Sequence, residues 1–328
     1  MGSRGRFRYV DAHENAITDE DKLERIRSLV IPPAWKEVWI SPNGSAKLQA
    51  TGVDAAGRRQ YLYHANFRAQ REQAKFDKLI SFAERLPELR AAMAEHMDHD
   101  ALDRLRVSAI ATRLINAGWF RVGSERYAKE SRTYGITTLR KSHVHVRGDR
   151  IAFDFVAKHR TVVRTTLVDE ELAESVKELL ELSGRRLFRY AWEGSVYNLT
   201  GARLNDYVRD YLGDDFTAKD FRTWGGTLIA AIAFAEEGPP ENEAAAKKAI
   251  PAVMRRVGKE LGNTPAVARS SYVSPAVIDQ YLDGRTIQDF RPRHLRVVSA
   301  RDTGLDPEEQ ALLSLLRSWK IRQARAAA

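Results

Sequence analysis

The stretch His143-Val144-His145-Val146-Arg147-Gly148-Asp149-Arg150-Ile151-Ala152-Phe153-Asp154-Phe155-Val156 decides how the second half of this chain folds. Apolar and polar residues alternate on both sides of a turn at 147–150, a pattern typical of an antiparallel hairpin. Thr161–Val168 alternates in the same way and is expected to add a third strand. This order places Ala157-Lys158-His159-Arg160 at the tip of the second hairpin.

The sequence around these strands predicts helices. After Asp100, apolar residues such as Leu102, Leu105 and Ile110 recur at helical spacing. Further helices are expected over 170–182, 200–211, 218–236, 242–261 and 307–325. Pro251 is expected to kink or divide the fourth of these. We therefore expect a mainly α-helical domain over residues 101–328 that contains one small antiparallel β-sheet.

The first part of the chain has a different pattern. Between Leu29 and Tyr63, short β-forming segments alternate with turns such as Pro42-Asn43-Gly44. A charged helical pattern follows from Phe67 to about His99. The expected organisation is a β-rich N-terminal domain over residues 1–75, a helical linker region over 76–100, and the mainly helical domain over 101–328. The fold class is α+β multidomain.

The amino-acid composition limits the classes of function that the chain can have. Lysine and arginine number 53 against 44 acidic residues, so the formal charge of +9 favours polyanionic partners. The absence of cysteine excludes disulfides, thiolate metal sites and cysteine nucleophiles. No secretory signal is visible, and the longest apolar run, 227–235, is too short to span a bilayer. A soluble protein of the cytoplasm is expected.

Two segments fifty positions apart carry residues suited to phosphate chemistry: Lys219-Asp220-Phe221-Arg222-Thr223-Trp224-Gly225 and Gly262-Asn263-Thr264-Pro265 leading to Arg269-Ser270-Ser271-Tyr272. Breaking a phosphodiester without a metal requires a nucleophile, donors for the non-bridging oxygens and an acid for the departing oxygen. Tyr272 is the candidate nucleophile, because a phenol loses its proton far more readily than a sugar hydroxyl.

Three cationic side chains are candidates for the other roles. Arg121 and Arg222 stay protonated, and their forked donors match the oxygens of a transferring phosphoryl group. Lys158, at a hairpin tip, suits the role of general acid. Each residue alone also has a plainer explanation, such as a solvated turn lysine or an arginine stacked on Trp224. Their occurrence together favours the catalytic interpretation.

The chain resembles the small type IB DNA topoisomerases of bacteria and poxviruses, and its N-terminal part resembles the matching region of the larger eukaryotic enzymes. The resemblance runs from about residue 29 to 283. It is carried by eight ordered segments: Leu29–Ile40, Leu48–Gly52, Arg59–His64, Phe120–Tyr127, Tyr134–Leu139, Phe155–Lys158, Lys219–Gly225 and Asn263–Tyr272.

The resemblance implies a role for each candidate. Arg121 and Arg222 would be the two transition-state arginines, Lys158 the general acid, and Tyr272 the nucleophile that forms a 3′-phosphotyrosyl link. Asn263 stands where many relatives carry histidine. An amide can donate a hydrogen bond to a phosphoryl oxygen but cannot be a cation or transfer a proton, so this position is expected to act by hydrogen bonding.

The resemblance also implies the reaction and the partner. The expected activity is relaxation of supercoiled double-stranded DNA by transient cleavage of one strand, rotation and religation, by a monomer at the nucleoid that needs no ATP, metal or other cofactor. The N-terminal domain would close over the duplex, with Gln60, Tyr61 and Tyr63 near the major groove. The two tyrosines equally fit cross-strand packing within a sheet. Lys219 would contact phosphate near Arg222.

Two alternatives stay open. A tyrosine site-specific recombinase uses a similar residue set, but its second arginine usually lies in a His-x-x-Arg motif, where this chain has Lys219. The segment Ile31-Pro32-Pro33-Ala34-Trp35 also has no place in recombinases. A non-catalytic DNA-binding protein would not need Lys158 and Tyr272.

Two further patterns are not expected to form sites. His96, Asp98, His99 and Asp100 fit no metal-binding motif, and an exposed helix end is expected there. Gly225-Gly226-Thr227 lacks the lysine and the spacing of a phosphate-binding loop, so no nucleotide site is indicated.

Overall fold

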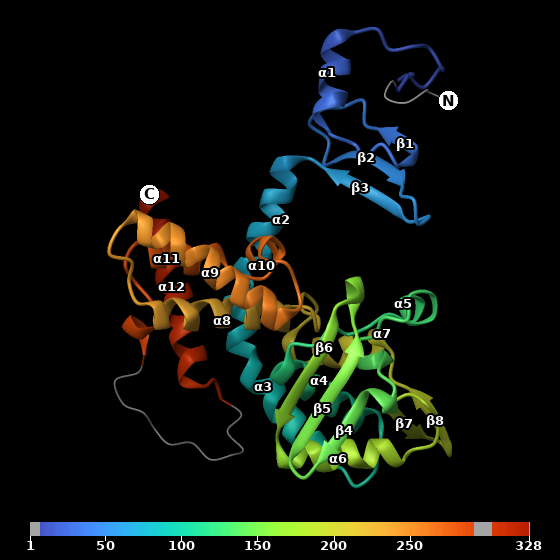
Figure 1. The fold of residues 1–328 in the computed structure, drawn as a ribbon, viewed down its shortest axis with the longest axis vertical. Coiled ribbons are helices and arrows are strands. Elements are labelled where there is room, and N and C mark those ends of the chain that lie inside the picture. The colour runs from blue at the N-terminus through green and yellow to red at the C-terminus, as the bar shows by residue number, and fades with distance from the viewer. Residues whose placement is uncertain (1–6, 292–303, 328) are drawn as a thin grey trace. The chain divides into compact units, whose positions relative to one another are not determined.

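The computed structural model describes residues 7–291 and 304–327. Its packing divides the chain into two compact units, Met1–Lys75 and Phe76–Ala328, both drawn in Figure 1. Helix α2 (Ala65–Asp77) contains the boundary between them. The predicted α+β class, with a small N-terminal β-sheet and a mostly helical larger unit, is confirmed.

The smaller unit is built on three antiparallel strands in the order β1 (Lys36–Ile40), β2 (Leu48–Val53) and β3 (Arg59–Tyr63). Gly52 in the central strand lies under the Trp35 indole, because a Cβ there would come within 2.6 Å of that ring. Helix α1 (Glu20–Ser28) precedes the sheet and was not predicted. Ile26 is its one buried residue, so the helix leaves little apolar periodicity in the sequence.

The three strands expected in the larger unit are present as β4 (Val144–Arg147), β5 (Arg150–Val156) and β6 (Val162–Val168), which pair antiparallel in that order. The register sets Phe153 opposite Thr165 and Phe155 opposite Val163. Between β5 and β6 the chain makes a single 3-10 turn, Lys158–Arg160. Lys158 is therefore at the hairpin tip, as the alternation predicted.

Helices pack around this sheet and form one continuous core with it. Helix α3 (Leu79–Met97) lies in the segment expected as a linker, yet its apolar face is buried in the core of the larger unit. The other helices described are α4 (Arg104–Gly118), α5 (Glu125–Glu130), α6 (Glu170–Glu181), α7 (Gly201–Leu212), α8 (Asp220–Glu237), α9 (Glu243–Leu261), α10 (Pro265–Ser271), α11 (Pro275–Leu282) and α12 (Pro307–Ala327).

Several local expectations differ from the structure. Pro251 lies inside α9 and does not divide it. His96 is buried rather than exposed, because its Nδ1 pairs with the Tyr207 hydroxyl at 2.9 Å inside the core. The hairpin β7 (Arg189–Trp192) and β8 (Ser195–Asn198) was not predicted. Among the residues that the structure describes, no helix is long and apolar enough to cross a membrane.

Candidate active site

Helix α8 is the platform of the site. Phe221 and Trp224 in its first turns are almost completely buried and anchor the helix in the core. Asp220 at the helix start accepts a hydrogen bond from the Thr217 amide at 2.8 Å, which satisfies a donor just outside the helix. Arg222 lies between these anchors, so its guanidinium emerges from a rigid and buried segment.

Arg222 is 5% exposed, and its guanidinium donates to two carbonyls. Nη1 donates to the Trp119 carbonyl, and Nη2 donates to the Leu261 carbonyl at 2.6 Å. Nε is buried and has no hydrogen-bond partner among the described residues. Burial, and then the charge of Arg121, lower the Arg222 pKa to about 10, so the group is still a cation at neutral pH.

Arg121 follows the end of α4 and is half-buried. Its Nη2 donates to the Asn263 side-chain oxygen at 2.7 Å and to the Gly262 carbonyl at 3.2 Å. Because a guanidinium can only donate, the Asn263 atom that faces it must be the oxygen. Burial lowers the pKa of Arg121 from its ordinary value.

Asn263 is positioned by the end of α9. Gly262 adopts the left-handed conformation with φ 59°, which glycine tolerates at a helix C-terminus, and turns the chain toward α10. The Asn263 amide nitrogen donates to the Leu261 carbonyl at 3.2 Å. A side-chain amide has two N–H groups, so one remains for another acceptor while the oxygen holds Arg121.

Tyr272 follows directly after α10, and its ring centre lies 5.1 Å from the Arg222 guanidinium carbon. Burial acts to raise the Tyr272 pKa, but the charge and hydrogen bond of Arg222, together with the charges of Arg121 and Lys219, outweigh burial and lower it. The exposed Lys219, at the start of α8, therefore contributes to this field. The Tyr272 phenolate therefore forms more readily here than in an isolated tyrosine.

Lys158 is exposed in the turn between β5 and β6. No hydrogen bond or ion pair joins its ammonium group to the other predicted catalytic residues in the described part of the chain. The residue that follows this turn does reach the site, because a Cβ on Gly262 would lie 3.4 Å from the Thr161 methyl group. The structure thus brings four of the five predicted catalytic residues together and leaves Lys158 on the adjoining tip.

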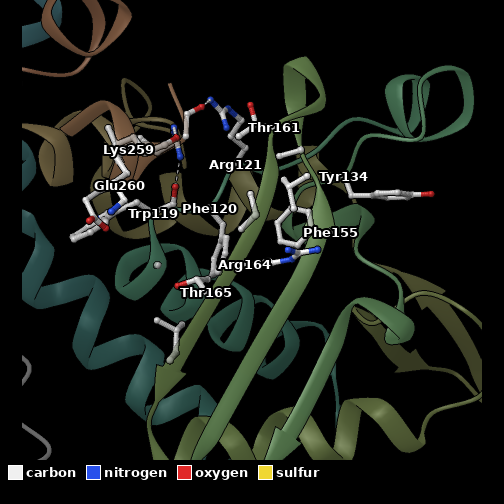
Figure 2. Close-up of a pocket in the computed structure, with 18 of the residues that line it drawn as sticks. Trp119, Phe120, Arg121, Tyr134, Phe155, Thr161, Arg164, Thr165, Lys259 and Glu260 are labelled. Carbon is white, nitrogen blue, oxygen red and sulfur yellow. Dashed lines mark hydrogen bonds between the residues drawn. The ribbon is translucent and has the colours of Figure 1, made fainter. Parts of the chain in front are cut away.

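A cavity of about 390 Å³ lies beside the two arginines. Figure 2 shows Trp119 and Lys259 on one side of it and Thr161 and Phe155, from the β5–β6 hairpin, on the other. Both Arg121 and Arg222 line it. Across the described residues, no group of three histidine or acidic side chains is placed to hold a metal ion.

The predicted DNA contacts of the smaller unit lie on β3. Tyr61 and Tyr63 are 52% and 41% exposed, and their rings stack with centres 6.4 Å apart. Gln60 is half-buried, and its amide donates to the Asp54 carboxylate at 2.8 Å. Since side chains alternate along a strand, Gln60 starts from the opposite face to the two tyrosines.

The sequence interpretation missed three residues that shape the site. Trp119 supplies a carbonyl to Arg222, and the Thr227 hydroxyl lies within hydrogen-bond distance of the Thr223 carbonyl, at 2.8 Å, and the Tyr272 carbonyl, at 3.0 Å. Gly226 lets Tyr272 approach α8, because a Cβ there would lie 2.8 Å from the Tyr272 Cβ. The available signal was the Gly225-Gly226 pair, which is unfavourable inside a helix unless another group must come close.

Comparison with known proteins shows the family to which the chain is similar. Residues 64–289, more than half of the chain, match the model of the eukaryotic DNA topoisomerase I catalytic core, and residues 6–54 match the bacterial DNA topoisomerase IB N-terminal domain. DNA topoisomerase 1B of Acanthamoeba polyphaga mimivirus is 32% identical over 288 residues, which is 85% of each chain. DNA topoisomerase 1B of vaccinia virus strain Copenhagen is 23% identical over 285 residues, 82% of this chain and 85% of the viral one.

Proposed function

Because the chain belongs to the type IB DNA topoisomerases, an isomerase family, we propose that it relaxes supercoiled duplex DNA through a transient 3′-phosphotyrosyl link. The observation that carries this proposal is the packing of Tyr272 against Arg222, with Arg121 and Asn263 joined beside them. This arrangement supplies a nucleophile of lowered pKa and two fixed cations without a metal ion.

In the cleavage step, the Tyr272 phenolate oxygen attacks the scissile phosphorus and forms a phosphorus–oxygen bond. The bond from phosphorus to the 5′ oxygen breaks, and its electron pair leaves with that oxygen. Lys158 gives the departing oxygen a proton, because an alkoxide is a poor leaving group at neutral pH. This role requires the hairpin tip to approach the 5′ oxygen when DNA is bound.

The two arginines stabilise the charge that develops on the non-bridging oxygens. The buried Nε–H of Arg222 has no partner among the described residues, and a phosphoryl oxygen would satisfy it. Arg121 is oriented by Asn263, whose remaining N–H is available to a second oxygen. Preorganised donors of this kind stabilise a transition state by about 2.7–4 kcal/mol each.

Religation is the reverse reaction. The free 5′ hydroxyl attacks the phosphotyrosine, Lys158 accepts its proton, and the Tyr272 phenolate leaves. The phosphodiester energy is retained in the covalent link, so the cycle needs no ATP, and the torsion of the supercoil drives rotation before resealing. The proposed enzyme acts as a monomer on duplex DNA, with Lys219, Gln60, Tyr61 and Tyr63 as further DNA contacts.

The decisive test is relaxation of a negatively supercoiled plasmid in EDTA without ATP by the wild type and by Tyr272→Phe. We expect the wild type to relax the plasmid and to leave a denaturant-stable protein–DNA adduct, and the variant to do neither. Wild-type protein that binds DNA but forms no adduct would indicate the non-catalytic alternative. Reciprocal strand exchange between two duplexes would indicate a recombinase.

A further inference from the structure

Trp119 ends α4 in a backbone conformation that bulky residues rarely adopt. Its φ of 48° and ψ of 35° lie in the left-handed region, and its amide donates to the Ile115 carbonyl at 2.8 Å. In this region the Cβ atom crowds the following carbonyl oxygen, so glycine or asparagine usually occupies such a helix end. A tryptophan stays there only when tertiary contacts hold it.

Two contacts with α8 hold Trp119. Its carbonyl accepts the hydrogen bond from Nη1 of Arg222. Its indole lies against Gly225, where a Cβ would come within 2.2 Å of the indole nitrogen. Gly225 follows Arg222 by three residues, nearly one helical turn, so the backbone and the side chain of Trp119 contact the same face of α8.

The Arg222 guanidinium depends on this contact for its orientation. The second carbonyl that accepts from its terminal nitrogens is that of Leu261. Two carbonyls, one on each terminal nitrogen, define the plane of the group and direct the unpaired Nε–H away from them. Displacement of the Trp119 carbonyl would remove one of the two carbonyls that fix the plane of the guanidinium.

We propose that Trp119 is a positioning residue for Arg222: its left-handed backbone directs its carbonyl at the guanidinium, and its indole on Gly225 keeps that carbonyl in place. The inference rests on the proposed function, because it assumes that Arg222 stabilises the transition state. Glycine would adopt the same backbone without strain but would not press the loop against α8. This explains why a large aromatic residue stands at a position where glycine is favoured.

Three substitutions distinguish the contribution of the left-handed backbone at residue 119 from the contribution of the indole. Trp119→Phe keeps an aromatic ring on Gly225, Trp119→Asn loses the ring but tolerates the left-handed region, and Trp119→Val loses both features. In single-turnover cleavage of a duplex with a defined site, we expect a rate order of Phe, then Asn, then Val. The Val variant should lose about ten- to hundredfold, short of the roughly 10²–10³ expected when a donor is removed outright.

Two readouts distinguish positioning from a general loss of structure. The dissociation constant for DNA should change by less than about twofold, because phosphate contacts across the surface dominate binding. The lower limb of the pH–rate profile should move to higher pH in Trp119→Val, since Arg222 is one of the cations that lower the Tyr272 pKa. A purely structural role would lower the amount of active protein without moving this limb.

Gly225→Ala tests the same contact from the other side and leaves Trp119 unchanged. The added methyl group would displace the indole, so cleavage should fall by about tenfold although alanine favours the helix.

Glu193→Val is the matched control for Trp119→Val, because it also places valine at a left-handed position. Glu193 also has a left-handed backbone, with φ 46°, but lies in the exposed β7–β8 turn, so its replacement should leave cleavage within about twofold of wild type.

The outcomes separate the two proposals. If the wild type forms no covalent adduct, the proposed function fails and this inference fails with it. If the wild type forms the adduct and both Trp119→Val and Gly225→Ala cleave within about twofold of it, only the positioning role is overturned. An unshifted pH limb in both slowed variants would also overturn it.

Discussion

The Arg222 guanidinium carbon lies 5.1 Å from the centre of the Tyr272 ring, so the candidate nucleophile and a buried cation are in direct contact. The contact has consequences for both groups. Tyr272 has a lowered pKa because the neighbouring positive charges and the Arg222 hydrogen bond outweigh its burial, and the terminal nitrogens of Arg222 are held by the Trp119 and Leu261 carbonyls. A substitution of Arg222 is therefore expected to change the pKa of Tyr272 as well as the stabilisation of the transition state.

Arg222→Gln should move the pH dependence of cleavage. The Arg222 charge lowers the Tyr272 pKa, so without it a higher pH is needed to form the same fraction of phenolate. We expect the lower limb of the single-turnover pH–rate profile to shift upward and the plateau rate to fall by about 10²–10³. Arg209→Gln removes an arginine ion-paired with Asp206 in α7 and serves as the control. An unshifted limb would show that Arg222 does not set the Tyr272 pKa.

Asn263→His should make cleavage sensitive to acid. A neutral imidazole can accept the Arg121 hydrogen bond through a ring nitrogen, whereas the protonated form only donates and repels the guanidinium. Neighbouring cations lower the histidine pKa, so activity relative to wild type should fall as the pH drops below about 6.5. Cleavage rates measured from pH 5 to 8 check this. Asn263→Ala should be slower by a pH-independent factor, and a flat ratio for the histidine variant would contradict the prediction.

Part of this structure was predictable because it depends on local patterns. The alternation in residues 143–168 placed Lys158 at a hairpin tip, and two ordered motifs identified Arg222 and Tyr272 as neighbours in function. The turns Thr264-Pro265 and Ser274-Pro275 also carry helix-start signals for α10 and α11, since each polar residue caps the helix that its proline begins. These two short helices lie outside the set of helices that apolar periodicity predicts.

Other parts depend on contacts between distant segments, which no local pattern records. The left-handed backbone of Trp119 is held by two contacts with α8: Arg222 donates to its carbonyl, and its indole packs on Gly225. His96 was expected at an exposed helix end, yet Tyr207 from α7 provides a buried partner for its ring. The expected role of Asn263 was donation to phosphate, and the structure adds an acceptor role toward Arg121 that becomes visible only when the two segments meet.

Gly226→Ala should displace the nucleophile. A methyl group at this position would lie 2.8 Å from the Tyr272 Cβ and 2.9 Å from its carbonyl oxygen, closer than packed atoms approach. Overpacking of this kind costs about 1–3 kcal/mol, which exceeds the roughly 1 kcal/mol gained by replacing a helical glycine. We expect a lower thermal midpoint and slower adduct formation at unchanged DNA affinity. A more stable variant with wild-type cleavage would show that Tyr272 is not confined by α8.

Thr227→Val should loosen the backbone around Tyr272. The buried Thr227 hydroxyl lies 3.0 Å from the Tyr272 carbonyl and accepts from the Ser274 amide at 3.1 Å, so it joins the chain on both sides of Val273. The same hydroxyl lies 2.8 Å from the Thr223 carbonyl, so its one proton is shared between the two carbonyls. Valine has nearly the same shape but removes this donor and the acceptor of the Ser274 amide, which costs about 1–3 kcal/mol.

Thr227→Ser is the matched variant, because it restores the hydroxyl and lacks only the methyl group. Single-turnover cleavage and thermal unfolding should be measured on both variants. If the hydroxyl positions Tyr272, serine recovers most of the cleavage rate even where the lost methyl group lowers stability. Equal cleavage by the valine variant and the wild type, with only a lowered midpoint, would assign Thr227 to folding alone and leave Gly226 and Arg222 as the residues of α8 that hold the nucleophile.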